Sequence, residues 1–410
     1  MRRTLLALVV ILWPSSASAQ AVSHTGFVDG RLFGFPQTAP NDATRIIGDA
    51  LFRNEIVLRP ADWFQFAAGL DLRANSHDQV EDQWRLDFED RRVRRPRAAV
   101  RRLAATLAGR GFTLDVGKQF IRWGRADIIY PTDRFAPRDY MNVIDSELLP
   151  VLGARASIQR GSETFEAVWV PRLTPSRLPL LDQRWVVVPA ADAAGLTLAD
   201  GGSVLPRGAQ FGGRWRHTGS RLETALSFFD GFNHSPDIEA RLRPDGATID
   251  VVRVHPTIRM YGGDVAVPTG WFTLKAEAAY VTSPPATSDE YVLYVVEVER
   301  QTGEWLLDVG YAGEVVRQSR VPLFFSPDRS MARSIIGRAS YTVDPRRTVV
   351  IEGAARQSGD GFYAKVQYSQ AMTQRWRLTL TGVGLAGDPA DFLGQYRRNS
   401  HGSVALRFSF

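Results

Sequence analysis

The chain has 410 residues, a formal net charge of +6, 44% hydrophobic residues and no cysteine. The lack of cysteine excludes disulfides and thiolate metal sites, and a small charge of mixed sign argues against a nucleic-acid partner. The mean hydropathy of −0.18 would suit a soluble protein, but a transmembrane sheet has a similar average because only every second residue of a strand faces lipid.

The N-terminus has the pattern of a secretory signal peptide. Two arginines precede the apolar run from Leu5 to Trp13, which is too short to cross a bilayer, and Ala17-Ser18-Ala19 supplies the small residues of a cleavage site. We therefore predict a signal peptide over 1–19 and a single mature domain over 20–410. A buried N-terminal helix or strand is the alternative.

The mature chain alternates apolar and polar residues in segments bounded by turn residues, which is the pattern of strands. Short connections such as Gly161-Ser162 alternate with longer gaps such as 124–150. Bacterial transmembrane barrels have short periplasmic turns, longer extracellular loops and an even strand number. The sequence therefore predicts an all-β fold, an antiparallel up-and-down transmembrane barrel of about eighteen strands. About sixteen is the alternative, if 256–268 and 271–282 form a folded loop.

Two segments of the first third carry cations in unusual places. The arginine-rich stretch 91–102 lies at the outer end of a predicted strand, where arginine could bind lipopolysaccharide phosphates or line a solvated rim. In 112–123, strict alternation would point Lys118 and Arg122 at lipid. Either these cations reach the membrane interface, or Gly117 marks a bulge that shifts the register.

Two of the long loops, 124–150 and 172–206, are long enough to fold into the barrel. The second is unusually apolar, so it needs a partner surface. We predict that it forms a constriction through Trp185, Asp182 and Arg184. Binding of an apolar solute and packing on neighbouring loops are the alternatives.

Alternation also predicts the inward face of the barrel, because outward positions must be apolar in lipid. A barrel of this width should hold water or a folded loop. The predicted lumen and selectivity residues are Arg214, Arg216, Lys275, Glu277, Arg338, Glu352, Lys365, Arg375, Arg377 and Arg407. Cations dominate toward the C-terminus, which favours anionic or carboxylate-bearing solutes, unless acidic groups elsewhere neutralise this wall.

The chain ends on an alternating strand in which Val404, Leu406, Phe408 and Phe410 share one face. A terminal phenylalanine on such a strand is typical of outer-membrane barrels, whose assembly machinery reads it. We therefore predict the outer membrane of a Gram-negative bacterium as the location and expect Phe410 to contact that machinery.

Residues 117–139 contain Gly-Lys-Gln, then Trp-Gly, then Pro-x-Asp. This motif resembles a family of proteobacterial outer-membrane, porin-like barrels with no established substrate, and the chain is more distantly similar in plan to alginate-export and substrate-specific porins. The resemblance implies a channel or export conduit. The motif residues are Gly117, Gln119, Trp123, Gly124, Asp127, Asp133, Pro137 and Asp139. An ordered extracellular loop is the favoured interpretation of the motif, over a substrate site.

Together these features predict an outer-membrane channel for diffusion of small solutes, without a cofactor, a metal or enzyme activity. A loop-plugged export conduit or envelope-assembly partner is one alternative. A rim enzyme of the lipase or acyltransferase kind is another, because His234 and His401 each lie next to a serine, although no catalytic triad is recognisable from spacing. The expected partners are membrane lipids, lipopolysaccharide and a small solute, with a homotrimer or a periplasmic transport partner as further options.

Overall fold

The structure is a computed structural model that describes residues 22–410 except 128, 187–195, 322–326 and 358–359. The predicted signal peptide lies outside the described residues, as do Val187 and Val188 of the apolar loop. No helix in the described part of the chain is long and apolar enough to cross a membrane.

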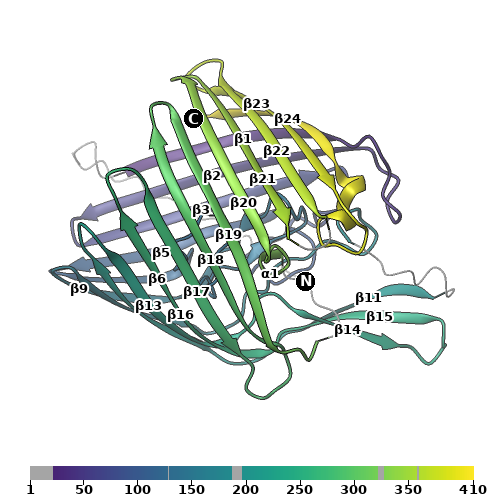
Figure 1. The fold of residues 1–410 in the computed structure, drawn as a ribbon, viewed down its shortest axis with the longest axis horizontal. Coiled ribbons are helices and arrows are strands. Elements are labelled where there is room, and N and C mark those ends of the chain that lie inside the picture. Colours follow the sequence, from purple (N-terminus) through teal and green to yellow (C-terminus); the bar gives the residue numbers. More distant parts are fainter. Residues whose placement is uncertain (1–21, 128, 187–195, 322–326, 358–359) are drawn as a thin grey trace, which may run out of the picture.

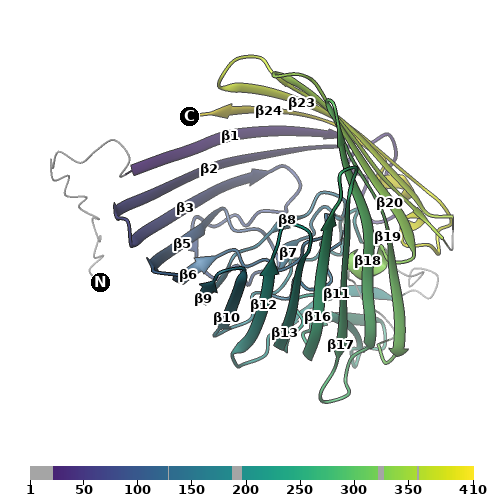
Figure 2. The ribbon, with the colours of Figure 1, turned by 60° about the vertical axis from the view of Figure 1, so that its left-hand side comes forward.

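Eighteen antiparallel strands in the described part of the chain close into a barrel (Figures 1 and 2). The barrel strands are β1 (Val22–Gly34), β2 (Ile46–Ala61), β3 (Phe64–Asn75), β5 (Ala98–Gly109), β6 (Phe112–Gln119), β9 (Val151–Arg160), β10 (Glu163–Val170), β12 (Gln210–Thr218), β13 (Glu223–Phe232), β16 (Thr257–Pro268), β17 (Thr273–Thr282), β18 (Glu290–Thr302), β19 (Trp305–Gln318), β20 (Ser334–Asp344), β21 (Arg347–Arg356), β22 (Phe362–Ala371), β23 (Trp376–Ala386) and β24 (His401–Ser409). The predicted strand number is confirmed, and the sixteen-strand alternative is wrong because β16 and β17 belong to the barrel wall.

The barrel closes between its first and last strands. β1 pairs with β24 from Phe27 opposite Ser409 to Gly34 opposite Gly402. Gly26 and Phe410 add a reciprocal pair of backbone hydrogen bonds of 3.1 and 3.0 Å. Closure leaves no unpaired strand edge in lipid, where such an edge would be costly.

The two faces of the strands differ as alternation predicts. On β17, Leu274 is exposed on the outer face, whereas the inward Glu277 is only 2% exposed. Among the described residues, four of the six exposed tryptophans lie at the end with the short turns, namely Trp63, Trp271, Trp305 and Trp376. Aromatic residues of this kind form a belt at a membrane interface, so the short turns mark one membrane surface and the long loops extend from the other.

The long loops contain further short elements. These are β4 (Leu86–Asp87), the pair β7 (Arg138–Asp139) and β8 (Glu147–Leu148), a separate sheet of β11 (Thr197–Val204), β15 (Thr248–Val254) and β14 (Asp237–Leu242), the helix α1 (Pro327–Ser330) and the 3-10 helix η2 (Gly394–Asn399). The β11–β15–β14 sheet projects from the long-loop end of the barrel (Figure 1).

The two cations of 112–123 do not face lipid, so the inward and outward assignment that strict alternation gives for them is wrong. Gly117 has a φ of +127°, and Lys118 is 1% exposed, with its ammonium 2.6 Å from Asp90. The segment after β4 covers Lys118, so neither interfacial snorkelling nor a shift of strand pairing is involved. Arg122 lies beyond the end of β6 and pairs with Asp133.

Candidate solute pathway

The loop between β6 and β9, residues 120–150, folds into the barrel and is held by carboxylates from both the loop and the wall. Within the loop, Asp133 accepts hydrogen bonds from the backbone N–H groups of Trp123 at 2.5 Å and Gly124 at 2.6 Å. A side chain at Gly124 would be crowded, since a Cβ there would lie 3.0 Å from Tyr130 and 3.3 Å from the Glu277 carboxylate. This close approach explains why the motif has glycine after tryptophan.

Glu277 of β17 anchors the loop to the barrel wall. Its carboxylate accepts hydrogen bonds from the N–H groups of Arg125 (2.7 Å), Ala126 (3.0 Å) and Thr132 (2.8 Å), and from the Thr132 hydroxyl (2.8 Å). Buried backbone N–H groups need such partners, because an unpaired buried polar group is costly. Glu277 therefore binds the loop rather than lining open water.

Other charges of the same wall also bind the loop. Arg125 reaches Asp264 of β16 at 2.7 Å and Glu223 of β13 at 2.6 Å. Lys275 lies 2.5 Å from the carboxylate of Asp127, which is itself a loop residue. The lumen between β10 and β18 is thus filled by the loop and its ion pairs.

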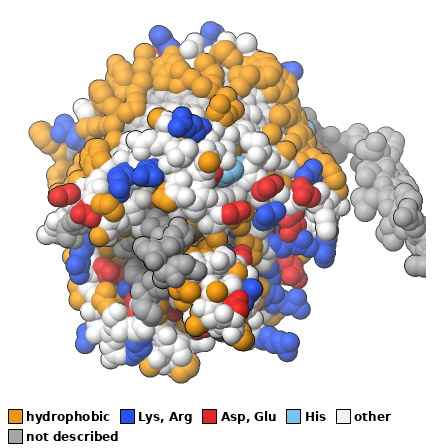
Figure 3. Space-filling model, turned by 90° about the vertical axis from the view of Figure 1, so that its right-hand side faces the viewer, with side chains coloured by type: hydrophobic (Ala, Val, Ile, Leu, Met, Phe, Trp, Pro, Cys, Tyr) orange, Lys and Arg blue, Asp and Glu red, His pale blue; other side chains and the backbone are white. Residues whose placement is uncertain are grey.

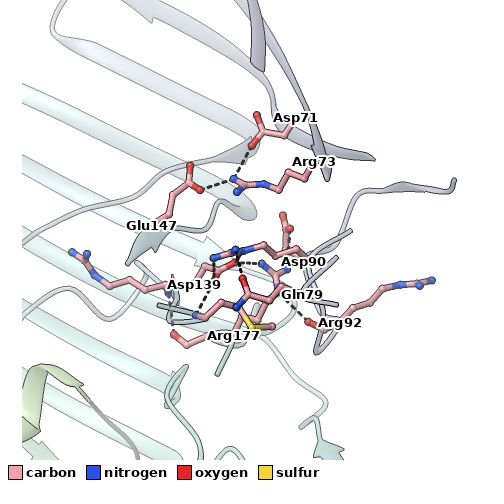
Figure 4. A network of polar contacts seen from close by, with 12 residues as sticks. Asp71, Arg73, Gln79, Asp90, Arg92, Asp139, Glu147 and Arg177 are labelled. Atoms are coloured by element: carbon pink, nitrogen blue, oxygen red, sulfur yellow. Dashed lines mark hydrogen bonds and ion pairs between the residues drawn. The ribbon is translucent and has the colours of Figure 1, made fainter. Parts of the chain in front are cut away.

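A second group of ion pairs ties the far end of the loop to β2, β3 and β5. Figure 4 draws Glu147 of this group with Arg73 and Asp71. Glu147 pairs with Arg53, Arg73 and Arg101, the last at 2.9 Å. Burial alone would raise the pKa of Glu147, but these guanidinium groups lower it well below its usual range. The carboxylate therefore stays ionised and holds the loop at all ordinary pH values. A register shift at Gly69, where β3 meets β5, accompanies the inward position of Arg101.

Asp139 forms the centre of the third group of contacts, also drawn in Figure 4. Arg95 and Arg177 lie 2.8 and 2.6 Å from its carboxylate. Burial would raise the pKa of Asp139, but these two arginines lower it well below its usual range. Arg95 and Arg101 of the 91–102 stretch are therefore bound to acidic partners inside the protein. Lipopolysaccharide binding by this stretch stays a prediction.

Two cavities remain between the tip of the loop and the wall formed by β1, β2 and β22–β24. Their volumes are about 230 and 260 Å³. Both are lined by Arg31 and Arg407 on the wall and by Asn142 and Asp145 on the loop. The ion pair between Arg31 and Asp145, at 2.6 Å, crosses from wall to loop and is partly exposed. The two cavities and this ion pair together define the candidate solute site at this wall.

The first cavity has a cationic lining. Arg31, Lys365, Arg377 and Arg407 face it, against the carboxylates of Asp29 and Asp145. Arg407 pairs with Asp29 at 2.9 Å, and Lys365 lies 3.6 Å from Glu352. Arg377 donates to the Ser369 hydroxyl at 3.2 Å and has no acidic partner among the described contacts. Arg377 is therefore the cation of this wall that is free to meet an anion.

The remaining predicted lumen residues have different positions. Arg214 is bound to Asp264 at 2.7 Å on the filled side. Arg216 is exposed, and its cross-strand partner Ala225 is buried. Arg338 of β20 lies in register between Asp308 and Glu352. Arg375 lies in the short turn before β23, outside both cavities.

The loop 172–206 contributes less to the constriction than predicted. Trp185 lines the second cavity and contacts the rings of Tyr396 and His401. Arg184 is buried over the Phe35 ring at 3.7 Å, and Asp182 is exposed outside both lumen cavities. The loop 120–150 supplies the lining residues Asn142, Asp145 and Glu147, which are not among the predicted site residues.

The motif residues mostly build the inward loop. Gln119 donates to the backbone carbonyls of Asp115 and Gly153, and the Pro137 carbonyl accepts the N–H of Leu149 at 2.8 Å. With Trp123, Gly124, Asp127, Asp133 and Asp139 described above, these contacts give the motif a folding role. The loop is ordered, as predicted, but it lies inside the barrel.

A serine–histidine contact occurs in the loops above the filled side. The Ser176 hydroxyl lies 2.9 Å from Nδ1 of His234, and both residues are buried. Neither residue lines the cavities described above. The hydroxyl of Ser235, the serine that follows His234 in the sequence, lies 3.4 Å from the same Nδ1 atom.

Neither a scan of protein-family models nor a search of curated proteins finds a match to the chain. Among solved structures, the chain is similar to a BenF-like porin from Pseudomonas fluorescens Pf-5 (TM-score 0.57, 10% identity, covering 95% of this chain and 98% of that one). It is also similar to OpdQ from Pseudomonas aeruginosa (TM-score 0.55, 10% identity) and to OccAB4 from Acinetobacter baumannii (TM-score 0.53, 11% identity), each with 95% of this chain and 98% of the other covered. The chain therefore has the fold of these porins.

Proposed function

We propose that the protein is an outer-membrane channel for diffusion of small solutes, with a preference for anionic or carboxylate-bearing ones. The observation that carries this proposal is the cavity faced by Arg31, Lys365, Arg377 and Arg407 between the inward loop and the barrel wall. Guanidinium groups bind carboxylates through paired, charge-assisted hydrogen bonds. The mechanism is diffusion down a gradient, without bond chemistry or a cofactor.

The test is single-channel conductance of the refolded mature protein in a planar bilayer, with the reversal potential measured under a salt gradient. We expect steady conductance and a reversal potential of the sign that indicates anion preference. Cation preference would contradict the solute class, and a silent barrel would contradict the open channel.

A loop-plugged export conduit is the second candidate function. It is favoured by the extent of the inward packing, since the loop 120–150 fills one side of the lumen and Trp185 lines the second cavity. A conduit predicts no conductance until the loop is removed, so the same bilayer measurement on a loop-replaced variant separates the two functions.

Further parts of this proposal rest on the sequence. The signal peptide 1–19 would direct export, and Phe410, which is 42% exposed, would contact the assembly machinery. Membership of the motif-bearing barrel family, similarity to alginate-export porins, homotrimer formation and a periplasmic transport partner belong to the same proposal. Cleavage after Ala19, read by N-terminal sequencing of the exported protein, tests the first of these.

A further inference from the structure

The outer face of the barrel is hollowed where β23, β24 and β1 meet. Gly402 pairs with Gly382 on one side and with Gly34 on the other, so three exposed glycines form a row across these strands. Val366 and Ile46 flank the row on the next strands. The glycines form the floor of a groove of about 670 Å³, with side walls that include leucine and valine.

The backbone does not require these glycines. A Cβ on Gly34 or Gly382 would meet nothing within 4 Å, and one on Gly402 would meet only the Thr381 carbonyl at 3.8 Å. Their φ values lie outside the left-handed region. Glycine weakens a strand interior and often marks the close approach of a ligand. This row therefore keeps the groove open rather than serving the fold.

The hollow continues around the barrel. A second groove of about 810 Å³ lies over β1, β2 and β3, and shares Leu32 and Val404 with the first. Both grooves lie toward the ends of the strands that carry the long loops, since Gly34 and Ile46 adjoin the β1–β2 loop. In a barrel of this orientation that half faces the outer leaflet.

Three exposed arginines lie close in sequence to groove residues at the same end. Arg45 directly precedes β2, and its carbonyl accepts the N–H of Phe35. Arg397 and Arg398 belong to η2, which leads into β24. None of the three side chains has an acidic partner among the described contacts. Figure 3 shows basic side chains beside the hydrophobic surface of the wall at this end of the molecule.

We propose that the groove and these arginines bind a phosphorylated glycolipid of the outer leaflet, the lipid A part of lipopolysaccharide. An acyl chain would lie over the glycine row, and a phosphate would contact Arg45, Arg397 and Arg398. Charge complementarity selects this occupant, because guanidinium groups pair well with phosphate. A two-fold contact with a second copy would instead bring the arginines of both copies together, which like-charge repulsion opposes. This inference does not depend on the channel function.

The experiment is native mass spectrometry of the refolded mature barrel in detergent, titrated with purified bis-phosphorylated, hexa-acylated lipid A and, separately, with phosphatidylglycerol. We expect one tightly bound lipid A. The triple variant Arg45→Gln, Arg397→Gln, Arg398→Gln should weaken its binding on the order of tenfold or more. A filled groove, Gly382→Val with Gly402→Leu, should weaken it comparably.

Matched controls are Arg207→Gln, which removes an exposed arginine from another loop, and Ala278→Val, which enlarges an exposed outward residue on β17. Both should bind lipid A like the unchanged protein. Equal losses in controls and test variants would overturn the proposal, as would equally tight binding of phosphatidylglycerol. A change of oligomeric mass in the filled-groove variant, with lipid A binding unchanged, would assign the groove to a second copy instead. If that variant fails to refold, the arginine variant alone decides.

Discussion

The two sides of the lumen carry the same kinds of residues but use them differently. On the β10–β18 side, Glu277 and Lys275 bind the backbone and a carboxylate of the inward loop. On the β22–β24 side, Arg377 faces a cavity without an acidic partner among the described contacts. An inward charge therefore has a structural or a selective role according to whether a loop reaches it, and the strand pattern alone does not distinguish the two.

Replacing the loop should have the largest effect on this difference. If 125–147 is exchanged for a short Gly-Ser linker, the filled side becomes open and single-channel conductance should rise severalfold. Shortening the β14–β15 turn at 243–247, outside the lumen cavities, is the control and should leave conductance unchanged. An unchanged conductance in the loop-replaced barrel would mean that the loop does not limit the path.

Glu277→Ala should detach the loop from its wall. The change leaves three N–H groups and one hydroxyl without their acceptor. A loss of about 3 kcal/mol in the free energy of unfolding is expected, measured by urea titration of the refolded barrel. Arg216→Ala is the matched control, because Arg216 is exposed and has no described hydrogen bond or ion pair. Similar losses in both variants would contradict the anchoring role.

Acid should loosen the loops above the filled side through His234. Burial, and then the positive charge of Arg134, lowers the pKa of His234 to about 3, below the value of about 6.5 expected in an unfolded chain. The folded state then binds fewer protons, so stability is complete above about pH 6.5 and falls as the pH drops toward 3, by at most roughly 1.4 kcal/mol per unit. His234→Gln should remove this part of the slope between pH 6 and 4 in urea titrations. An identical slope in the variant would contradict the assignment.

Arg377→Gln should have a small effect confined to the open side. Removal of this cation should shift the reversal potential toward cations by a few millivolts at low salt, with less shift at high salt because of screening. Arg214→Gln is the comparison, since Arg214 is occupied by Asp264 on the filled side. If Arg214→Gln shifts selectivity as much as Arg377→Gln, the distinction between the two sides fails.

Strand number and closure follow from the sequence, because alternation and gap length are local properties. The roles of Glu277 and Arg101 do not follow, because their partners lie far along the chain; Glu277 is 145 positions from Thr132. The burial of Lys118 cannot be predicted from neighbouring residues either, because the segment around Asp90 covers it. Asp145 could not be predicted as a cavity residue, because its only described ion pair is with Arg31, 114 positions away.

The seam between β1 and β24 gives the chain an order of assembly. Arg407 and Asp29, which pair across it, are 378 positions apart, and the final residue supplies backbone hydrogen bonds to Gly26. Contacts between residues so distant in sequence carry the largest loop-closure entropy and tend to form late. A hairpin-by-hairpin sheet can grow while the chain is still being delivered, but its edge strands stay unpaired until β24 arrives. Quality control that senses an open edge would therefore detect any prematurely terminated copy of this protein.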